Sequence, residues 1–204
     1  MIETCFNHWV KAVDAGTRER LLTAAERLLL ESGYDAVSVR AVCTAAHVNP
    51  AAVHYHFGSK DALVSALLQA RLGPLWQAPL HDLIATEDPS IAACVQIVVA
   101  PLRALSADPT GRLYLHLLAR LFFSRRQPPW TDRWFTLDPW AQILHDNVPG
   151  LSPREARRRW MLAFELILGQ FGDPLAGDRV LSDDAVAALH RFVTAGLSAP
   201  LEDQ

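Results

Sequence analysis

Apolar residues recur every three or four positions along most of this chain, with polar and charged residues between them. In residues 17–32 the apolar positions, Leu21, Leu22, Ala25, Leu28 and Leu29, share one face of an amphipathic helix. Proline and glycine pairs interrupt the pattern further on, and the helices between them are expected at 59–72, 76–85, 89–106, 110–125, 131–147, 152–171 and 182–197. No segment alternates as a strand would, so the sequence predicts an all-α protein.

Two short helices joined by a tight turn are expected between residues 38 and 57. Ser38 has a side chain suited to capping the first of them, and Val42 faces its core. Asn49 and Pro50 then supply a cap and a first-turn proline for the second helix, which ends near Gly58. A helix, a turn and a helix in this order fit the major groove of DNA.

The same stretch resembles a known family. The ARERLL-type first helix, the pattern GY-x-x-x-SVR, the pattern A-A-x-V-N and above all VHYHFGSKDAL are similar to the DNA-binding domain of TetR-family bacterial transcriptional regulators. The resemblance covers residues 17–68, about a quarter of the chain. It implies an N-terminal arm at 1–16, a three-helix helix-turn-helix DNA-binding domain at 17–65, and a helical ligand-binding and dimerisation domain at 66–204.

The resemblance also implies which residues lie at or near DNA. Those suited to phosphate oxygens are Ser38, Tyr55 and Lys60, those able to read base edges are Arg40, Asn49 and His54, and those beside them are Pro50, Ala51 and Ala52. Between residues 17 and 60, five Arg and Lys side chains stand against four Asp and Glu. With so little positive charge, affinity is expected to depend on dimerisation and many weak backbone contacts.

Three histidines in this region need an interpretation. His47 stands where the family usually has a turn glycine, so it is expected to adopt a left-handed backbone conformation, which His tolerates better than most residues. His54 and His56 are two apart on a helix and point to nearly opposite sides, so the pair is not expected to hold a metal ion. No metal and no cofactor are expected.

Composition and charge narrow the class of protein. The 204 residues are 50% hydrophobic and 20% charged with a net charge of −3, which is typical of a globular protein without a polybasic tail. Residues 1–16 are too polar for a signal peptide, so a cytoplasmic protein is expected. Cys5, Cys43 and Cys94 are scattered, as free thiols in a reducing compartment are.

Aromatic residues are frequent in the middle helices of the second part. Core packing accounts for some of them, but a ligand cavity is also expected there. The residues assigned to this cavity are Trp76, Tyr114, His116, Arg120, Phe123, Trp134 and Phe164. His116 and Arg120 are four apart on one helix face and could meet a ligand carboxylate; a solvated arginine on a surface ledge is the alternative.

The last two expected helices carry broad apolar faces, which either close the core of one subunit or pair with a second copy. The resemblance implies pairing in a homodimer, which sets two reading helices about one turn of DNA apart. The residues assigned to this interface are Trp160, Phe164, Ile167, Leu168, Phe171, Leu189, Phe192 and Val193.

The expected function is therefore that of a ligand-responsive transcriptional repressor, a homodimer that binds a palindromic double-stranded operator and is released by a hydrophobic small molecule. RLGPL at 71–75 and FVTAGL at 192–197 are similar to segments of the TetR-family branch that responds to fatty acids or acyl-CoA. The candidate effectors therefore include compounds with a long acyl chain as well as aromatic drugs and other lipophiles. A TetR-like fold that binds ligand without operator is one alternative. A small all-α enzyme with His116 or His145 as base is the other, but no nucleophile or paired carboxylate supports it, so an enzyme is not expected.

Overall fold

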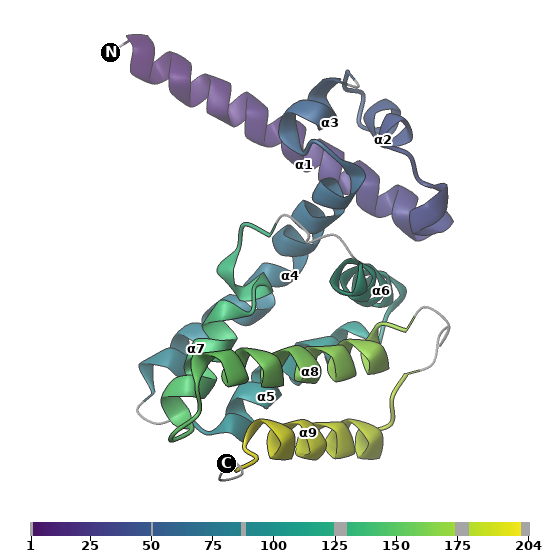
Figure 1. Cartoon of the computed structure of the whole chain (residues 1–204). Helices are drawn as coiled ribbons and strands as arrows, with labels where there is room; N and C mark the ends of the chain where they lie inside the picture. The colour runs from purple at the N-terminus through teal and green to yellow at the C-terminus, as the bar shows by residue number, and fades with distance from the viewer. Residues whose placement is uncertain (1, 50, 87–88, 125–129, 174–179, 201–204) are drawn as a thin grey trace. The chain divides into compact units, whose positions relative to one another are not determined.

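The computed structural model in Figure 1 describes residues 2–49, 51–86, 89–124, 130–173 and 180–200, and for residues 2–14, 52 and 54 it describes the backbone alone. Its elements are α1 (Ile2–Ala36), α2 (Val39–Ala45), α3 (Ala51–His56), α4 (Lys60–Ala85), α5 (Ile91–Leu105), α6 (Pro109–Phe123), the 3₁₀ helix η1 (Arg133–Phe135), α7 (Asp138–Asn147), α8 (Pro153–Phe171) and α9 (Asp183–Leu197). Within the described residues there is no strand, which confirms the all-α prediction. The chain divides into two compact units, one up to Leu67 and one from Leu68 onward.

The first unit has a small core that α1, α2 and α3 share. Leu21, Leu22 and Leu29 of α1 are at most 2% exposed, and so are Val42 of α2 and Val53 of α3. These are apolar positions that the helical period of the sequence places on inward faces. The two short helices are thereby held against α1 by side-chain burial.

The segment expected to be a separate arm is part of α1. The helix begins at Ile2 and continues through residue 17, so the predicted helix start at Thr17 is wrong. Thr17 does not act as a cap; its hydroxyl accepts a hydrogen bond from Arg20 Nη2 at 3.3 Å inside the helix. Residues 2–16 contain no proline, and a helix that has nucleated adds residues at little further cost. Helical geometry is interrupted at Gly33 (φ 75°, ψ 169°), close to the predicted end.

The break expected at Pro74 is absent, because α4 continues through both Pro74 and Pro79. Leu72, Trp76 and Leu80, spaced by four, form one buried face along this helix. A proline in a helix interior costs about 3 kcal/mol, whereas burying one large apolar side chain contributes about 1.5–3 kcal/mol. The continuous buried face therefore offsets the two prolines.

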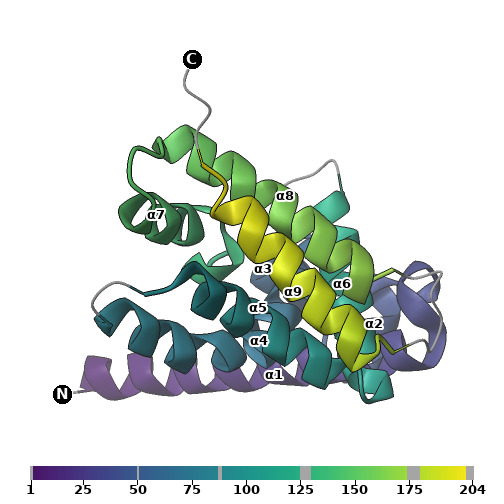
Figure 2. The same ribbon diagram turned by 90° about the horizontal axis from the view of Figure 1, so that it is seen from below.

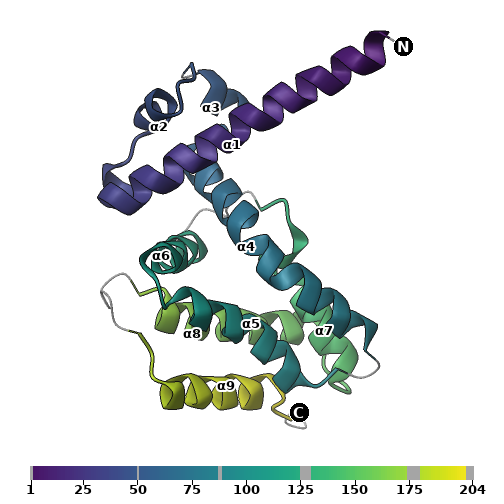
Figure 3. The same ribbon diagram turned by 180° about the vertical axis from the view of Figure 1, so that it is seen from behind.

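The second unit is built around α8, which packs against α5, α6, α7 and α9. Trp160 and Ile167 of α8 are at most 1% exposed. Figure 2 shows α8 and α9 side by side, and Figure 3 shows α5 alongside α9. The single helix expected at 131–147 is instead η1 followed by α7, since Pro139 takes the first turn of a new helix.

Side-chain caps set most of the helix starts. The capping residues accept a hydrogen bond from the backbone N–H three positions ahead, and they are Ser38, Ser59, Ser90, Asp108, Ser152 and Ser182. Each satisfies one of the N–H groups that a helix start leaves unpaired. The cap that the sequence predicted at Ser38 is among them and is confirmed.

Two of the three cysteines lie in the core. Cys43 and Cys94 are both buried, and neither forms a disulfide with another described residue, whereas the side chain of Cys5 lies outside the described residues. Burial raises the pKa of Cys94 to about 11 and also raises the pKa of Cys43. Both thiols therefore stay protonated and poorly nucleophilic at neutral pH. In the part of the chain that is described, no helix has the length and apolar character needed to cross a membrane.

Candidate nucleic-acid interface and ligand cavity

The turn between α2 and α3 has the geometry that its residues predict. Ser38 Oγ accepts a hydrogen bond from Ala41 N at 3.1 Å and caps α2. Beyond the other end of α2, His47 has a φ of 54°, and Val48 N donates to the carbonyl of Cys43 at 3.0 Å to close the turn. The left-handed conformation expected at His47 is confirmed.

Replacing His47 by glycine raises the free energy of unfolding by about 0.5–1 kcal/mol, because glycine adopts this conformation without the clash that a Cβ causes. Chemical denaturation followed by circular dichroism measures the change. His47→Val serves as the opposing control, since a β-branched residue tolerates positive φ less well than His. A valine variant as stable as the glycine variant would contradict the assigned strain.

Asn49 caps the start of α3. Its Oδ1 accepts a hydrogen bond from Ala51 N at 2.9 Å, and both residues are exposed. The cap uses one lone pair of the amide oxygen, and the two Nδ2 donors take no part in it, so they are the groups best placed to read a base edge. Pro50 lies outside the described residues, as do the side chains of Ala52 and His54.

One side of α3 is anchored in the core and the other faces solvent. Val53 is fully buried, whereas Tyr55 is 80% exposed. The N–H groups of Phe57 and Gly58 both donate to the carbonyl of Val53, and Gly58 has a φ of 76°, which ends the helix. The Tyr55 hydroxyl is therefore able to reach a phosphate oxygen. Ser38 and Arg40 are exposed as well.

Lys60 was expected to contact a DNA phosphate, but its side chain contacts Tyr34 of the first unit. Its Nζ donates a hydrogen bond to the carbonyl of Tyr34 and lies 4.0 Å from the centre of the Tyr34 ring. The Tyr34 hydroxyl in turn donates to Asp61. Since helical geometry breaks at Gly33, the Tyr34 carbonyl can accept from a donor outside α1. Lys60 thus fastens the start of α4 to the end of α1, a structural role that the sequence pattern did not reveal.

An apolar cavity of about 80 Å³ lies inside the second unit, bordered by α4, α5, α6, α7, α8 and the segment 130–137. Its aromatic lining consists of Trp76, Phe122, Trp130, Trp134, Phe135, Trp140 and Phe164. None of the described side chains that line it is charged. The rings meet at varied angles: the Trp76 and Phe135 planes are at 90°, whereas Trp130 and Phe135 are stacked with centroids 4.9 Å apart.

Three of the seven residues predicted for this cavity line it, and they are Trp76, Trp134 and Phe164. The other four do not: Tyr114 is buried elsewhere, His116 is half-buried, and Arg120 and Phe123 are exposed. The face that α6 turns to the cavity carries Leu118 and Phe122. Arg120 lies two positions from each of them, which is on nearly the opposite side of a helix. The predicted carboxylate partner is therefore not at the cavity.

Gln69 of α4 holds the segment 130–137 in place. Its Oε1 accepts hydrogen bonds from Thr131 N at 2.7 Å, Thr131 Oγ1 at 3.2 Å and Asp132 N at 2.6 Å. Trp140 Nε1 also donates to the carbonyl of Trp134 at 3.0 Å. These bonds fix the aromatic wall before any ligand arrives. Sequence reasoning missed Gln69, because a single glutamine on a helix belongs to no recognisable pattern.

His145, one of the two histidines considered as an enzyme base, hydrogen-bonds to the backbone. His145 Nδ1 lies 2.6 Å from the carbonyl of Leu151, an acceptor, so the ring nitrogen donates to it. Neither His145 nor His116 lines the cavity. Across the described residues, no group of three side chains is arranged to hold a metal ion.

Comparison with known proteins finds a similar domain for the first unit. Residues 21–67 match the family model described as "Bacterial regulatory proteins, tetR family". These residues include the capped turn, the reading helix α3 and the start of α4. Residues 21–67 are therefore similar to the DNA-binding domain of TetR-family regulators.

Individual TetR-type regulators are similar to the chain over different lengths. The transcriptional regulator UidR of Escherichia coli is 36% identical over 52 residues, which is 26% of this chain and 26% of UidR. BetI of Burkholderia lata is 25% identical over 131 residues, 64% of this chain and 57% of BetI. The chain thus matches about a quarter of the length of UidR and somewhat more than half of BetI.

A solved structure is similar over almost the whole chain. NalD, described as the secondary repressor of the MexAB-OprM multidrug efflux pump in Pseudomonas aeruginosa, has a TM-score of 0.63 and 26% identity over 91% of this chain and 98% of NalD. UidR, BetI and NalD are regulators, in agreement with the expectation that this chain is not an enzyme.

The residues predicted for a TetR-type dimer interface lie mostly in the core of one subunit. Those at most 7% exposed are Trp160, Ile167, Leu168, Phe171, Leu189 and Val193. Phe164 lines the cavity, and Phe192 is 70% exposed. Of this set, Phe192 and Val193 border the groove between α8 and α9, whereas α8 packs its more apolar side against α5, α6 and α7.

A different surface of the second unit is open, and we call it the outer face. A shallow groove between α8 and α9 is lined by Leu162, Leu166, Phe192 and Gly196. Leu162 is 58% exposed and Phe192 is 70% exposed. A Cβ added at Gly196 would meet nothing within 4 Å, so the groove has space there. Apolar side chains this exposed are typical of an interaction surface.

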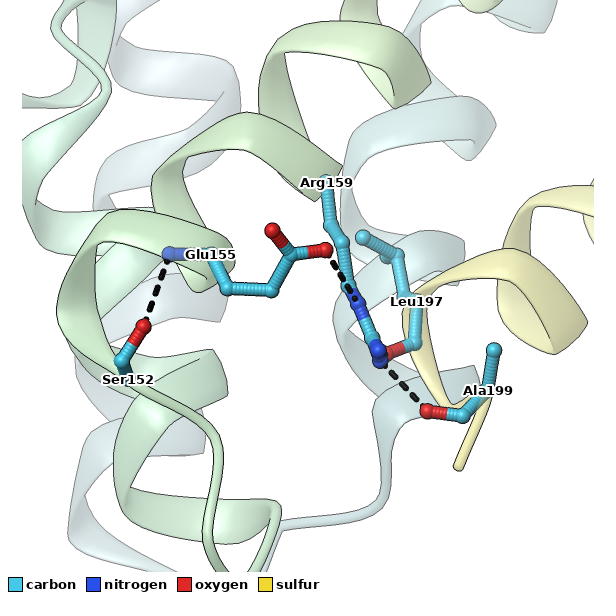
Figure 4. A network of polar contacts seen from close by, with 5 residues as sticks. All are labelled: Ser152, Glu155, Arg159, Leu197 and Ala199. Carbon is cyan, nitrogen blue, oxygen red and sulfur yellow. Dashed lines mark hydrogen bonds and ion pairs between the residues drawn. The ribbon is translucent and has the colours of Figure 1, made fainter. Parts of the chain in front are cut away.

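The two helices under the outer face are locked together by Arg159 (Figure 4). Its Nη1 donates to the carbonyl of Leu197 at 2.9 Å and to that of Ala199 at 2.6 Å, and its Nε donates to Glu155 Oε1 at 3.4 Å. Ser152 Oγ caps the same helix by accepting from Glu155 N at 3.2 Å. The guanidinium satisfies the carbonyl of Leu197, the last residue of α9, which the helix end leaves unpaired, and that of Ala199 just beyond the helix. The outer face is therefore presented on a rigid pair of helices.

Proposed function

We propose that this chain is a homodimeric, cytoplasmic transcriptional regulator that represses genes by binding a palindromic operator and is released by an apolar small molecule. The observation that carries the proposal is the reading helix α3. It is capped by Asn49, anchored by the fully buried Val53 and exposed at Ala51 and Tyr55. A short helix held in this way offers its outer residues to base edges and phosphates in a major groove.

The homodimer is supported by the outer face of α8 and α9. A two-fold pair of reading helices matches a palindromic site and doubles the number of contacts. Such doubling suits this domain, because its positive charge barely exceeds its negative charge. The dimer therefore supplies affinity that one head lacks.

The effector site in this proposal is the aromatic cavity. A ligand there shifts the regulator between two populations only as far as it binds them with different affinity. Repression is the proposed sign of regulation, and NalD, a repressor similar over 91% of the chain, supports it. A fatty acid or acyl-CoA has no such support, since no charged side chain among the described ones lines the cavity.

The test is a fluorescence-anisotropy titration of the full chain against the DNA upstream of its own gene and neighbouring genes. The expected result is a saturable complex with two protected half-sites about one helical turn apart, and an affinity that falls steeply with salt. Binding that is equal for every DNA sequence at low salt would overturn the proposal. It would favour the alternative of a TetR-like fold that binds ligand alone.

A further inference from the structure

We infer that the aromatic cavity takes a small, uncharged, planar aromatic compound that carries one hydrogen-bond acceptor. The inference rests on the proposed function of the cavity as the effector site and names the chemical class of that effector. Of the effector classes that the sequence left open, it retains aromatic compounds and excludes carboxylates and long acyl chains.

The ligand is expected to be uncharged because of the side chains that line the cavity. None of the described side chains around the cavity is charged, and Arg120, the expected partner for an anion, is exposed on another side of α6. A carboxylate or ammonium that enters would lose its hydration without gaining a partner of opposite charge. A neutral ligand avoids this penalty.

The ligand is expected to be planar because of the volume of the cavity and the aromatic side chains that form its walls. The cavity measures about 80 Å³, roughly half of the ~150 Å³ of an apolar cavity that holds benzene. A single ring needs only a small displacement of the lining, whereas drug-sized ligands occupy pockets of about 300–1,000 Å³. Gln69 and the Trp140–Trp134 hydrogen bond hold the loop wall and oppose a larger opening. Flat rings also match aromatic walls, which favour stacked and edge-to-face neighbours.

The ligand is expected to carry a hydrogen-bond acceptor because one donor among the described side chains of the lining has no partner. Trp76 lines the cavity, and its Nε1 is buried without a hydrogen-bond partner among the described residues. A buried N–H without an acceptor is unfavourable, so a ligand oxygen that reaches it gains a hydrogen bond that the empty site lacks. Two other polar groups of the lining already have partners: the Thr136 hydroxyl donates to the carbonyl of Arg133 at 2.7 Å, and Trp140 Nε1 donates to the carbonyl of Trp134 at 3.0 Å.

Four probes of graded chemistry test the class. Acetophenone has a ring and a carbonyl acceptor, ethylbenzene has nearly the same shape without the acceptor, benzoate adds a charge, and palmitate replaces the ring by a long acyl chain. Isothermal titration calorimetry on the full chain is expected to rank acetophenone first, ahead of ethylbenzene by roughly threefold to tenfold, the value of one hydrogen bond. Tighter binding of benzoate or palmitate, or no binding of any probe, would overturn the inference.

Trp76→Phe keeps a ring in the wall and removes its N–H. The variant is expected to lose the preference for acetophenone over ethylbenzene while it still binds ethylbenzene. Trp160→Phe is the matched control, because Trp160 Nε1 is equally buried and unpartnered but Trp160 does not line the cavity. The control is expected to keep the preference; equal loss in both variants would show that the effect comes from general repacking and would sink the inference.

Operator binding is measured separately on the same proteins. If the chain binds a specific operator but does not prefer acetophenone, the ligand class is wrong and the proposed regulator stands. If the preference is present and no operator is bound, the ligand class stands and the regulator does not.

Discussion

Replacing Asn49 by serine lowers operator affinity by roughly 30-fold to 20,000-fold and leaves α3 folded. Serine keeps a side-chain oxygen that can cap the helix, as Asn49 Oδ1 does for Ala51 N, but it removes the Nδ2 donors. A lost base contact is worth about 1–3 kcal/mol, and a homodimer loses it twice. Anisotropy titration of the proposed operator measures the effect, and circular dichroism checks the helix.

Two comparisons sharpen this prediction. Asn147→Ser makes the same substitution on α7 in the second unit and is expected to leave operator affinity unchanged. Tyr55→Phe removes only an exposed hydroxyl and is expected to weaken binding by a smaller factor, about threefold to a hundredfold for two phosphate contacts. Should Asn49→Ser bind the operator as tightly as the unchanged chain, α3 would not be the reading helix.

Placing glutamate at Leu162 and Phe192 converts the proposed dimer to a monomer and lowers operator affinity about a hundredfold or more. Both side chains are exposed in one subunit, at 58% and 70%, so the substitutions leave its core unchanged. In a dimer, four carboxylates would enter an apolar interface without partners, which is strongly unfavourable. Loss of the second head removes the avidity of a linked pair, typically 10²–10⁴-fold. Sedimentation velocity at micromolar concentration measures the mass.

The controls separate the outer face from the face that the sequence pattern favoured. Ile84→Glu introduces the same charge at another exposed apolar residue and is expected to leave the dimer intact. Ile167→Ala, in the core of one subunit, is expected to lower the free energy of unfolding by about 2–5 kcal/mol without producing folded monomers. A dimer that survives the Leu162 and Phe192 substitutions would place the interface elsewhere.

Local features were predicted best, because they depend on residues within one turn of each other. Ser38 and Asn49 were predicted as caps from residue type and position, and each accepts the hydrogen bond expected of it. His47 was predicted to have a positive φ because it replaces a turn glycine, and it does. The assignment of α3 and its exposed Tyr55 therefore needed little beyond the sequence.

Features that depend on distant partners were predicted poorly. Pro74 was expected to end a helix, but packing along Leu72, Trp76 and Leu80 carries α4 through it. Lys60 has a charge suited to phosphate, and only the fold brings the Tyr34 carbonyl within its reach. The spacing of Leu72, Trp76 and Leu80 is visible in the sequence, but their burial is not, and the contact between Lys60 and Tyr34 has no signal in the neighbouring residues.

By itself, the sequence determined the helical class, most helix boundaries and the reading head, because helix periodicity, capping and turn conformation are local properties of the chain. Tertiary structure decided which apolar face of α8 is core and which is open, and which residues of α6 reach the cavity. A helix with apolar residues on two sides can bury either one, and the choice depends on the helices packed against it. The cavity and the outer face are therefore properties of the assembled second unit.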